Sequence, residues 1–234
     1  MTIPRLFEDE SIIAVEKPRD IHVHPTKLSR GEISVQVILE EELGMSLYPA
    51  HRLDRPVGGV LLIAKNVEAA SKFGEAIRSR DGMDKRYLCV VRGWMEGSGV
   101  LDRPMRQAPG KPERDAVTRW RALGQAEADW PDGRFPTSRY TLVESILETG
   151  RYHQIRRHLS VASHPILGDV SHGDNPRNRI WMKETGIEGL MLRGHRLSFI
   201  HPLSGRRISL TASADPRFVR AAELFGWDRR LVTE

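Results

Sequence analysis

A carboxylate flanked by two arginines is the group in this sequence best suited to do chemistry. Asp54 lies between Arg52 and Arg55 in residues 51–56, and the apolar run 60–64 follows almost directly. Nearby guanidinium groups hold a carboxylate ionised, which is the state that a nucleophile or a general base needs. A surface ion pair that caps a turn would use the same residues, because structural pairs also perturb carboxylates. The pattern therefore predicts either a reactive aspartate or a structural turn at Asp54.

A second stretch with chemical potential covers residues 150–163. If this stretch is helical from about His153, Arg156 follows three positions later and points the same way. A basic, solvated helix face would show the same composition. Tyr87 lies in a predicted strand, and on the residues alone we expect it to be a half-buried core aromatic.

Two groups of histidines raise the question of a metal site. His22 and His24 alternate along the chain, but no third ligand or cysteine lies near them in the sequence. The second group would suit a dinuclear, phosphoesterase-type centre, and its members are His158, His164, Asp169, His172 and Asp174. Their spacing matches no ligand pair carried on a helix. We therefore expect no metal.

Length and composition limit the class of protein. A chain of 234 residues can bury one good core, so we expect one domain. Its 36 Lys and Arg against 31 Asp and Glu give a formal charge of +5, which suits a phosphate-backbone partner without requiring one. The single cysteine, Cys89, excludes an internal disulfide. Residues 1–10 carry charges where a signal peptide would be apolar. No apolar run approaches the roughly 20 residues of a membrane span. We predict a soluble cytoplasmic protein.

Hydrophobic periodicity and turn residues predict both helices and strands. Residues 32–43 place Ile33, Val37, Ile38 and Leu43 on one core-facing side, with Gly44 as the stop. Residues 97–114, rich in proline and glycine, predict a long surface loop. Further helices are predicted at 66–80, from about 153, and at 215–225. Strands are predicted at 11–15, 60–64, 85–93, 117–122, 140–146, 189–200 and 207–211.

Taken together, four motifs resemble the signature of RluA-type pseudouridine synthases. They are His-Arg-Leu-Asp at 51–54, Lys-Arg-Tyr at 85–87, Gly-Arg-Tyr-His-Gln-Ile-Arg at 150–156, and Gly-Asp followed by His-Gly within 168–173. All four occur in the family's order, and the resemblance extends from about 11 to about 211. In residues 134–179 the sequence resembles in particular the small bacterial members of the family that act on transfer RNA.

The resemblance implies an α+β fold with a mixed, largely antiparallel central sheet flanked by helices and long loops. It implies a single pseudouridine synthase catalytic domain over 1–234, without the extra N-terminal RNA-binding domain of some relatives. The implied reaction isomerises a uridine in RNA and uses neither cofactor nor metal. We expect the target to be uridine 65 of transfer RNA. We expect a monomer whose partner is RNA. The alternatives are a ribosomal RNA uridine, a non-catalytic RNA-binding protein on the same fold, and the metal-dependent phosphoesterase.

The resemblance also assigns roles to residues. Asp54 becomes the catalytic nucleophile or base, and Arg156 its ion-pair partner. Tyr87 stacks on the target uracil and assists in removing the C5 proton, Leu192 lines the uracil pocket, and Arg52 fills the gap left by the flipped base. The RNA backbone is expected to contact Lys85, Arg86, Arg151, Arg157, Arg177 and Arg179.

The sequence departs from the family pattern in two places. Residues 57–59 read Val-Gly-Gly where members usually carry Thr-Ser-Gly, and residues 192–194 read Leu-Arg-Gly where they usually carry Leu-His-Ala. The first departure removes two hydroxyls near the catalytic loop, and the second introduces a cation. Neither changes Asp54, Tyr87 or Arg156. We expect them to affect target preference and loop rigidity rather than the reaction.

Overall fold

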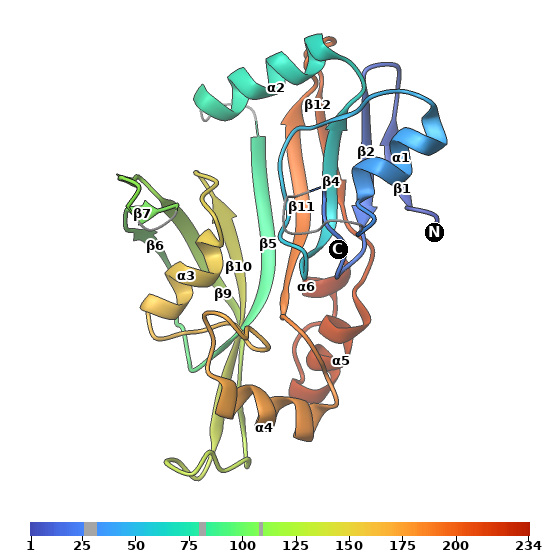
Figure 1. Ribbon diagram of the computed structural model, residues 1–234. Helices are drawn as coiled ribbons and strands as arrows, with labels where there is room; N and C mark the ends of the chain where they lie inside the picture. The colour runs from blue at the N-terminus through green and yellow to red at the C-terminus, as the bar shows by residue number, and fades with distance from the viewer. Residues whose placement is uncertain (26–31, 80–82, 108–109) are drawn as a thin grey trace. The chain divides into compact units, whose positions relative to one another are not determined.

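The chain forms two compact units, each built from strands and helices (Figure 1). Unit 1 comprises Met1–Lys85 and Arg193–Ser213, and unit 2 comprises Arg86–Leu192 and Ala214–Glu234. The computed structural model describes residues 1–25, 32–79, 83–107 and 110–234. The α+β class with a mixed, largely antiparallel sheet is confirmed. The expected single catalytic domain stays a prediction.

The sheet of unit 1 is arranged around its most apolar strand, β4 (Gly58–Ala64), whose seven residues are all buried. Strand β2 (Ile12–Lys17) pairs antiparallel with β4 and with β1 (Arg5–Glu8), and β3 (Tyr48–Pro49) also pairs antiparallel with β4. Strand β11 (Leu192–Ile200) pairs with β4 in parallel, and β12 (Arg207–Thr211) pairs antiparallel with β11. A strand buried on both faces reads as a continuous apolar run, which is why the sequence predicted β4.

Helix α2 (Val67–Ser79) forms as predicted, and it packs against this sheet. The side chain of Asn66 accepts a hydrogen bond from the Ala69 amide at 2.8 Å and so caps the helix. Phe73 of α2 meets Phe199 of β11 edge to face, with ring centroids 5.8 Å apart. The predicted end of the helix at Arg80 lies outside the described residues.

Helix α1 (Val35–Leu43) begins later than predicted. Ser34 caps the helix by accepting a hydrogen bond from the Val37 amide, and Gly44 ends it in the left-handed conformation, as expected. Because the cap is Ser34, Ile33 lies outside the helix and is 65 % exposed. The buried residues of the helix are Val35 and Leu39, so the predicted core-facing side was wrong.

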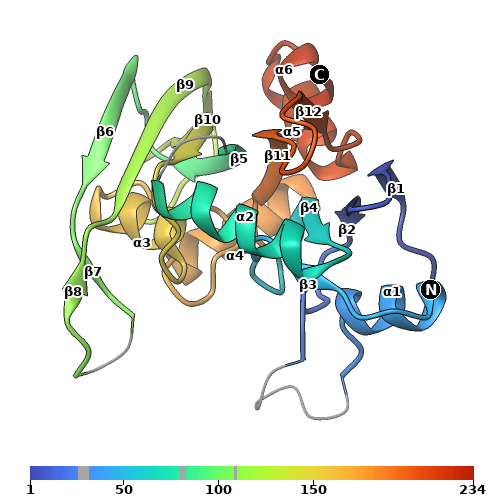
Figure 2. The same cartoon turned by 90° about the horizontal axis from the view of Figure 1, so that it is seen from above.

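The sheet of unit 2 is antiparallel, in the order β5 (Met83–Arg92), β10 (Ser138–Leu147), β9 (Val117–Ala128) and β6 (Ser98–Asp102) (Figure 2). Strands β7 (Met105–Arg106) and β8 (Glu113–Arg114) form a separate two-stranded ribbon. The predicted surface loop over 97–114 was therefore wrong, although 108–109 lie outside the described residues. Strand β6 is an edge strand held by its backbone bonds to β9, and this pairing needs no apolar pattern of its own.

The described residues of unit 2 include four helices. Helix α3 (Gln154–Val161) and α5 (Pro216–Phe225) were predicted, and Asp215 caps α5 as expected. Helix α4 (Asn175–Thr185) was missed because it buries few side chains, chiefly Trp181, and so shows no apolar stripe. A short helix, α6 (Arg230–Thr233), follows α5. In the part of the chain that the structure describes, every helix is too short or too polar to cross a membrane.

Candidate active site

Asp54 lies on a tight turn that leads directly into β4. The amide of Val57 donates to the carbonyl of Asp54 at 2.9 Å and closes the turn 54–57. Leu53 is buried beside it, and Asp54 itself is half-buried. Arg52 is exposed. The carboxylate is therefore attached to a backbone that is fixed on both sides but keeps access to solvent.

The turn 54–57 is held by the buried ammonium group of Lys17. Its Nζ donates to the carbonyls of Arg55 at 3.1 Å, Val57 at 2.8 Å and Pro18 at 2.9 Å. The amide of Asp20 also donates to the Arg55 carbonyl, at 2.8 Å. Lys17 is only 1 % exposed, so these three carbonyls take the place of its hydration shell. We call this arrangement the Lys17 clasp.

Burial changes the protonation of Lys17. It lowers the pKa of this lysine to about 7, and the negative charges of Asp20 and Asp54 act in the opposite direction. A lysine that loses its proton near neutral pH beside the candidate catalytic carboxylate was not predicted. No local sequence signal marks it, because its carbonyl partners at Arg55 and Val57 lie about 40 residues further along the chain.

The histidine of the first motif has a structural role. The Nε2 atom of His51 accepts a hydrogen bond from the amide of Leu62 in β4, at 3.2 Å. Burial, with a smaller contribution from the charge of Lys85, lowers the pKa of His51 to about 3, so the ring is neutral at physiological pH. Lys85 is half-buried, and burial lowers its pKa too.

The two departures from the family pattern lie next to each other in the fold. Gly58 pairs with Arg193 and Gly59 with Gly194 where β4 and β11 run in parallel. Gly59 has a φ of +125°, and a Cβ atom there would lie 2.0 Å from the carbonyl oxygen of Gly194. Arg193 is buried, and its Nη2 donates to Glu16 at 3.1 Å. The introduced cation is therefore part of a partly buried ion pair in unit 1.

The close approach of β4 and β11 makes Gly59 hard to replace. We expect Gly59→Ala to lower the free energy of unfolding by about 2–4 kcal/mol, because the backbone conformation is strained for alanine and the added carbon meets backbone. Chemical denaturation measures this loss. Gly44→Ala is the matched control: Gly44 has a φ of +65° but open space around it, so only the strain of about 1 kcal/mol is expected. Equal losses for both variants would contradict the close approach.

In unit 2, Arg156 forms a buried, bidentate ion pair with Asp169. Its Nε and Nη2 atoms lie 2.7 Å and 2.8 Å from the two carboxylate oxygens, and the side chains are 5 % and 1 % exposed. The carboxylate also accepts the amides of Ser171 and His172, at 2.9 Å and 3.0 Å. Burial alone would raise the pKa of Asp169, but the bonds from Arg156 and these amides hold it below its usual range. Asp169 thus fixes the guanidinium, a role that sequence reasoning had not assigned.

This pair should contribute measurably to the stability of unit 2. Asp169→Asn keeps the shape but leaves Arg156 buried with a neutral acceptor, so we expect a loss of about 2–3 kcal/mol in the free energy of unfolding. The control is Asp228→Asn, because Asp228 pairs with Arg230 on the exposed surface and little change is expected there. Similar losses of unfolding free energy in the two variants would show that the buried pair contributes no more to stability than the exposed pair.

The expected uracil-pocket residues are both buried, and both belong to unit 2. Tyr87 in β5 is 7 % exposed and lies opposite Ser145 of β10, and Leu192 is 3 % exposed. Tyr87 is thus more buried than the half-buried position that we expected from the sequence. Arg86, next to it, lies 3.7 Å from Glu144, so its charge is partly compensated.

The arginines predicted to contact RNA in unit 2 differ in how they are held. Arg177 lies between Asp132 and Asp174, 2.8 Å and 2.9 Å away, which makes it a structural cation. Arg151 and Arg157 each donate to a main-chain carbonyl, and Arg179 is exposed on α4. The phosphate contacts stay a prediction for all of them.

The histidines considered for a metal site make other contacts. His158 Nδ1 lies 2.8 Å from the Thr118 hydroxyl, and its Nε2 lies 3.1 Å from the Arg103 carbonyl. His164 Nδ1 lies 3.0 Å from the Arg92 carbonyl. Within the described ranges, no three histidine, cysteine or acidic side chains are grouped as they would be around a metal ion.

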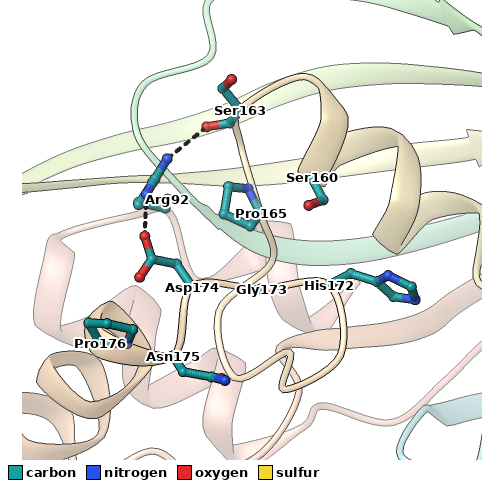
Figure 3. Close-up of a pocket in the computed structure, with 9 residues that line it drawn as sticks. All are labelled: Arg92, Ser160, Ser163, Pro165, His172, Gly173, Asp174, Asn175 and Pro176. Atoms are coloured by element: carbon teal, nitrogen blue, oxygen red, sulfur yellow. Dashed lines mark hydrogen bonds and ion pairs between the residues drawn. The ribbon is translucent and has the colours of Figure 1, made fainter.

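A hollow of about 460 Å³ opens between the end of α3 and the start of α4 (Figure 3). Arg92 spans it, donating to the carboxylate of Asp174 and to the carbonyl of Ser163. The Arg92 charge is therefore compensated by Asp174, the residue that caps α4. Asp54 and Arg156 belong to different units, so their expected ion pair stays a prediction.

The structure thus places a half-buried carboxylate on a clasped turn in unit 1 and a buried arginine fixed by an aspartate in unit 2. Residues 11–161 match the RNA pseudouridylate synthase family. The chain belongs to this family and is a pseudouridine synthase.

Its relatives include the tRNA pseudouridine synthase C of Pasteurella multocida, which is 37 % identical over 97 % of this chain and 98 % of the relative. That of Salmonella typhimurium is 37 % identical over 95 % of this chain and 89 % of the relative. Among solved structures, human RNA Pseudouridylate Synthase Domain Containing 4 has a TM-score of 0.70 and 22 % sequence identity. The match covers 96 % of this chain and 94 % of the human chain. The human Domain Containing 1 protein has a TM-score of 0.69 at 20 % identity, with 92 % and 84 % covered. These two show the fold alone.

Proposed function

We propose that this enzyme converts uridine 65 of transfer RNA to pseudouridine and that Asp54 is the reacting carboxylate. The transfer RNA substrate is supported by the names of relatives that match nearly the whole chain. The Lys17 clasp is the observation that supports Asp54 as the reacting carboxylate. A buried ammonium group and two backbone bonds fix the turn that bears this half-buried carboxylate. Such rigid support is typical of a group that must meet a substrate atom in a defined position.

The reaction needs only groups that the chain supplies. The bond from the ribose to N1 breaks, the uracil turns, and a new bond forms from the ribose to C5. The C5 proton leaves and N1 gains a proton, so the product is an isomer of the substrate. No electrons are transferred in net, so the chemistry requires no redox cofactor. Asp54 acts as a nucleophile or as a base in this sequence of steps.

The target base must leave its stack to reach Asp54. Arg52 is exposed two residues before Asp54, which suits a planar cation that fills the gap in the stack. Tyr87 and Leu192 offer a buried phenol and an apolar side chain for the uracil. Arg156, fixed by Asp169, is the proposed partner of the Asp54 carboxylate.

Tritium release from RNA labelled at C5 of uridine tests the proposal. We expect one equivalent of tritium per transfer RNA molecule, unchanged by a metal chelator, and none from a transcript in which position 65 is not uridine. Release only from ribosomal RNA fragments would replace the substrate and keep the reaction. Binding without release from any RNA would favour the non-catalytic RNA-binding protein.

A further inference from the structure

Three aromatic rings form a connected stack at the start of α3. The rings of Tyr152 and His153 are stacked, with centroids 3.7 Å apart and planes 21° from parallel. His153 in turn meets His172 edge to face, and its Nδ1 lies 2.9 Å from the Nε2 of His172. Tyr152 is 52 % exposed. An exposed ring is thus supported from behind by two imidazoles that hold each other through a hydrogen bond.

The backbone maintains this stack at a cost. His153 has a φ of +52°, in the left-handed region that residues other than glycine rarely adopt. Gln154 stabilises the conformation from the other side: its Oε1 accepts the Arg151 amide at 2.9 Å, and its Nε2 donates to Thr118 in β9 at 2.9 Å. Strain of this kind is concentrated at functional sites, where the fold enforces it.

Two arginines beside the stack keep their charges uncompensated. Arg157 donates to the carbonyl of Arg106 at 2.9 Å, and Arg151 to the carbonyl of Asp115 at 2.9 Å. Over the described ranges of the chain, neither forms an ion pair with an acidic side chain, whereas Arg119 pairs with Glu148. Each guanidinium is therefore anchored by a neutral oxygen and has further N–H groups to donate.

We propose that Tyr152, backed by His153 and His172, is a stacking platform for an unpaired base of the RNA substrate, and that Arg151 and Arg157 bind the phosphates beside that base. The exposed aromatic face suits the base of a nucleotide, and the anchored guanidinium groups beside it suit the phosphate. The inference rests on the proposed function and adds a contact apart from Asp54, Tyr87 and Leu192.

The test compares the affinity of four full-length proteins for an unmodified transfer RNA transcript by filter binding. Tyr152→Leu removes the ring and is expected to raise Kd about tenfold. Tyr152→Phe keeps the ring and is expected to bind like wild type. Phe135→Leu is the matched control, because Phe135 is 53 % exposed in the same unit but its ring lies under the guanidinium of Arg134. No change in Kd is expected for it.

An unchanged Kd for Tyr152→Leu, or an equal rise for Phe135→Leu, would overturn the platform. Photo-crosslinking of wild-type protein to a transcript that contains 4-thiouridine gives a second test that needs no folded variant. A crosslink at Tyr152 supports the platform, and crosslinks only elsewhere overturn it. Both readouts report binding, whereas tritium release by wild type reports the reaction, so failure of the platform and failure of the proposed function are distinguishable.

Discussion

Asp54→Asn is expected to abolish turnover and to leave RNA affinity within a few-fold of wild type. The change replaces one carboxylate oxygen by an amide nitrogen, which removes the nucleophile or base but little binding surface. Asp54 is half-buried at a turn closed by its own carbonyl, and asparagine keeps that backbone bond. We expect tritium release to fall by on the order of 10³-fold or more.

Asp20→Asn is the matched control for this prediction. Asp20 is the other carboxylate whose charge acts on Lys17, and its φ of +63° is a conformation that asparagine tolerates. The same chemical change in the same clasp should therefore leave most of the activity. Turnover by Asp54→Asn close to that of Asp20→Asn would remove Asp54 from the reaction.

Lys17→Met is expected to lower kcat about 100-fold at pH 7 while the chain stays folded. Methionine fills a similar volume but cannot donate to the carbonyls of Arg55 and Val57, so the turn that carries Asp54 loses its fixed position. A shift of about 1 Å in a catalytic group costs roughly this factor. Single-turnover tritium release at saturating RNA measures the loss.

Lys65→Met provides the control for the loss of a lysine in unit 1. Lys65 donates to Glu8 at 2.9 Å and to the carbonyl of Asp9 at 2.8 Å, so its bonds lie outside the turn of Asp54. We expect near wild-type kcat for this variant. An equal loss in both variants would mean that Lys17 acts through general stability rather than through the turn.

The pKa of Lys17 gives the clasp a pH dependence with a defined sign. This pKa is about 7 in the folded chain, below the ordinary value of 10.5, so between these pH values the unfolded chain holds more protons. The free energy of unfolding should therefore rise with pH across this window through Lys17. As the pH rises through about 7, kcat should fall, because the neutral amine has fewer N–H groups for the three carbonyls. Both trends should be absent in Lys17→Met, and their persistence there would assign them to another group.

Local patterns were sufficient for much of the secondary structure. The apolar run of β4, the Asn66 and Asp215 caps and the Gly44 stop depend on neighbours within a few residues, and the structure confirms them. Strand β6 and helix α4 were missed because their positions depend on partners distant in the chain. An edge strand needs only backbone bonds, and a helix with a single large buried side chain leaves no periodic signal.

The same division applies to the site. The motifs placed Asp54 in a turn, and the structure places Arg156 among buried side chains. Asp169 was interpreted only as a member of the fourth motif and of the possible metal cluster. Lys17 was assigned no role from the sequence, because its carbonyl partner in Val57 lies 40 residues away. Side-chain bonds across such distances depend on how strands are paired, which local sequence does not encode.

The sequence by itself determined the family, the reaction class and the candidate catalytic residues, because reacting groups are fixed by residue type and motif order. Tertiary structure alone decided which groups support them. It paired Gly58 and Gly59 with Arg193 and Gly194, buried Lys17 under the Asp54 turn, and stacked Tyr152 on His153. The physical reason is that burial and close approach arise only when distant segments pack, and these two effects set the pKa of Lys17, the strain at His153 and the need for glycine at position 59.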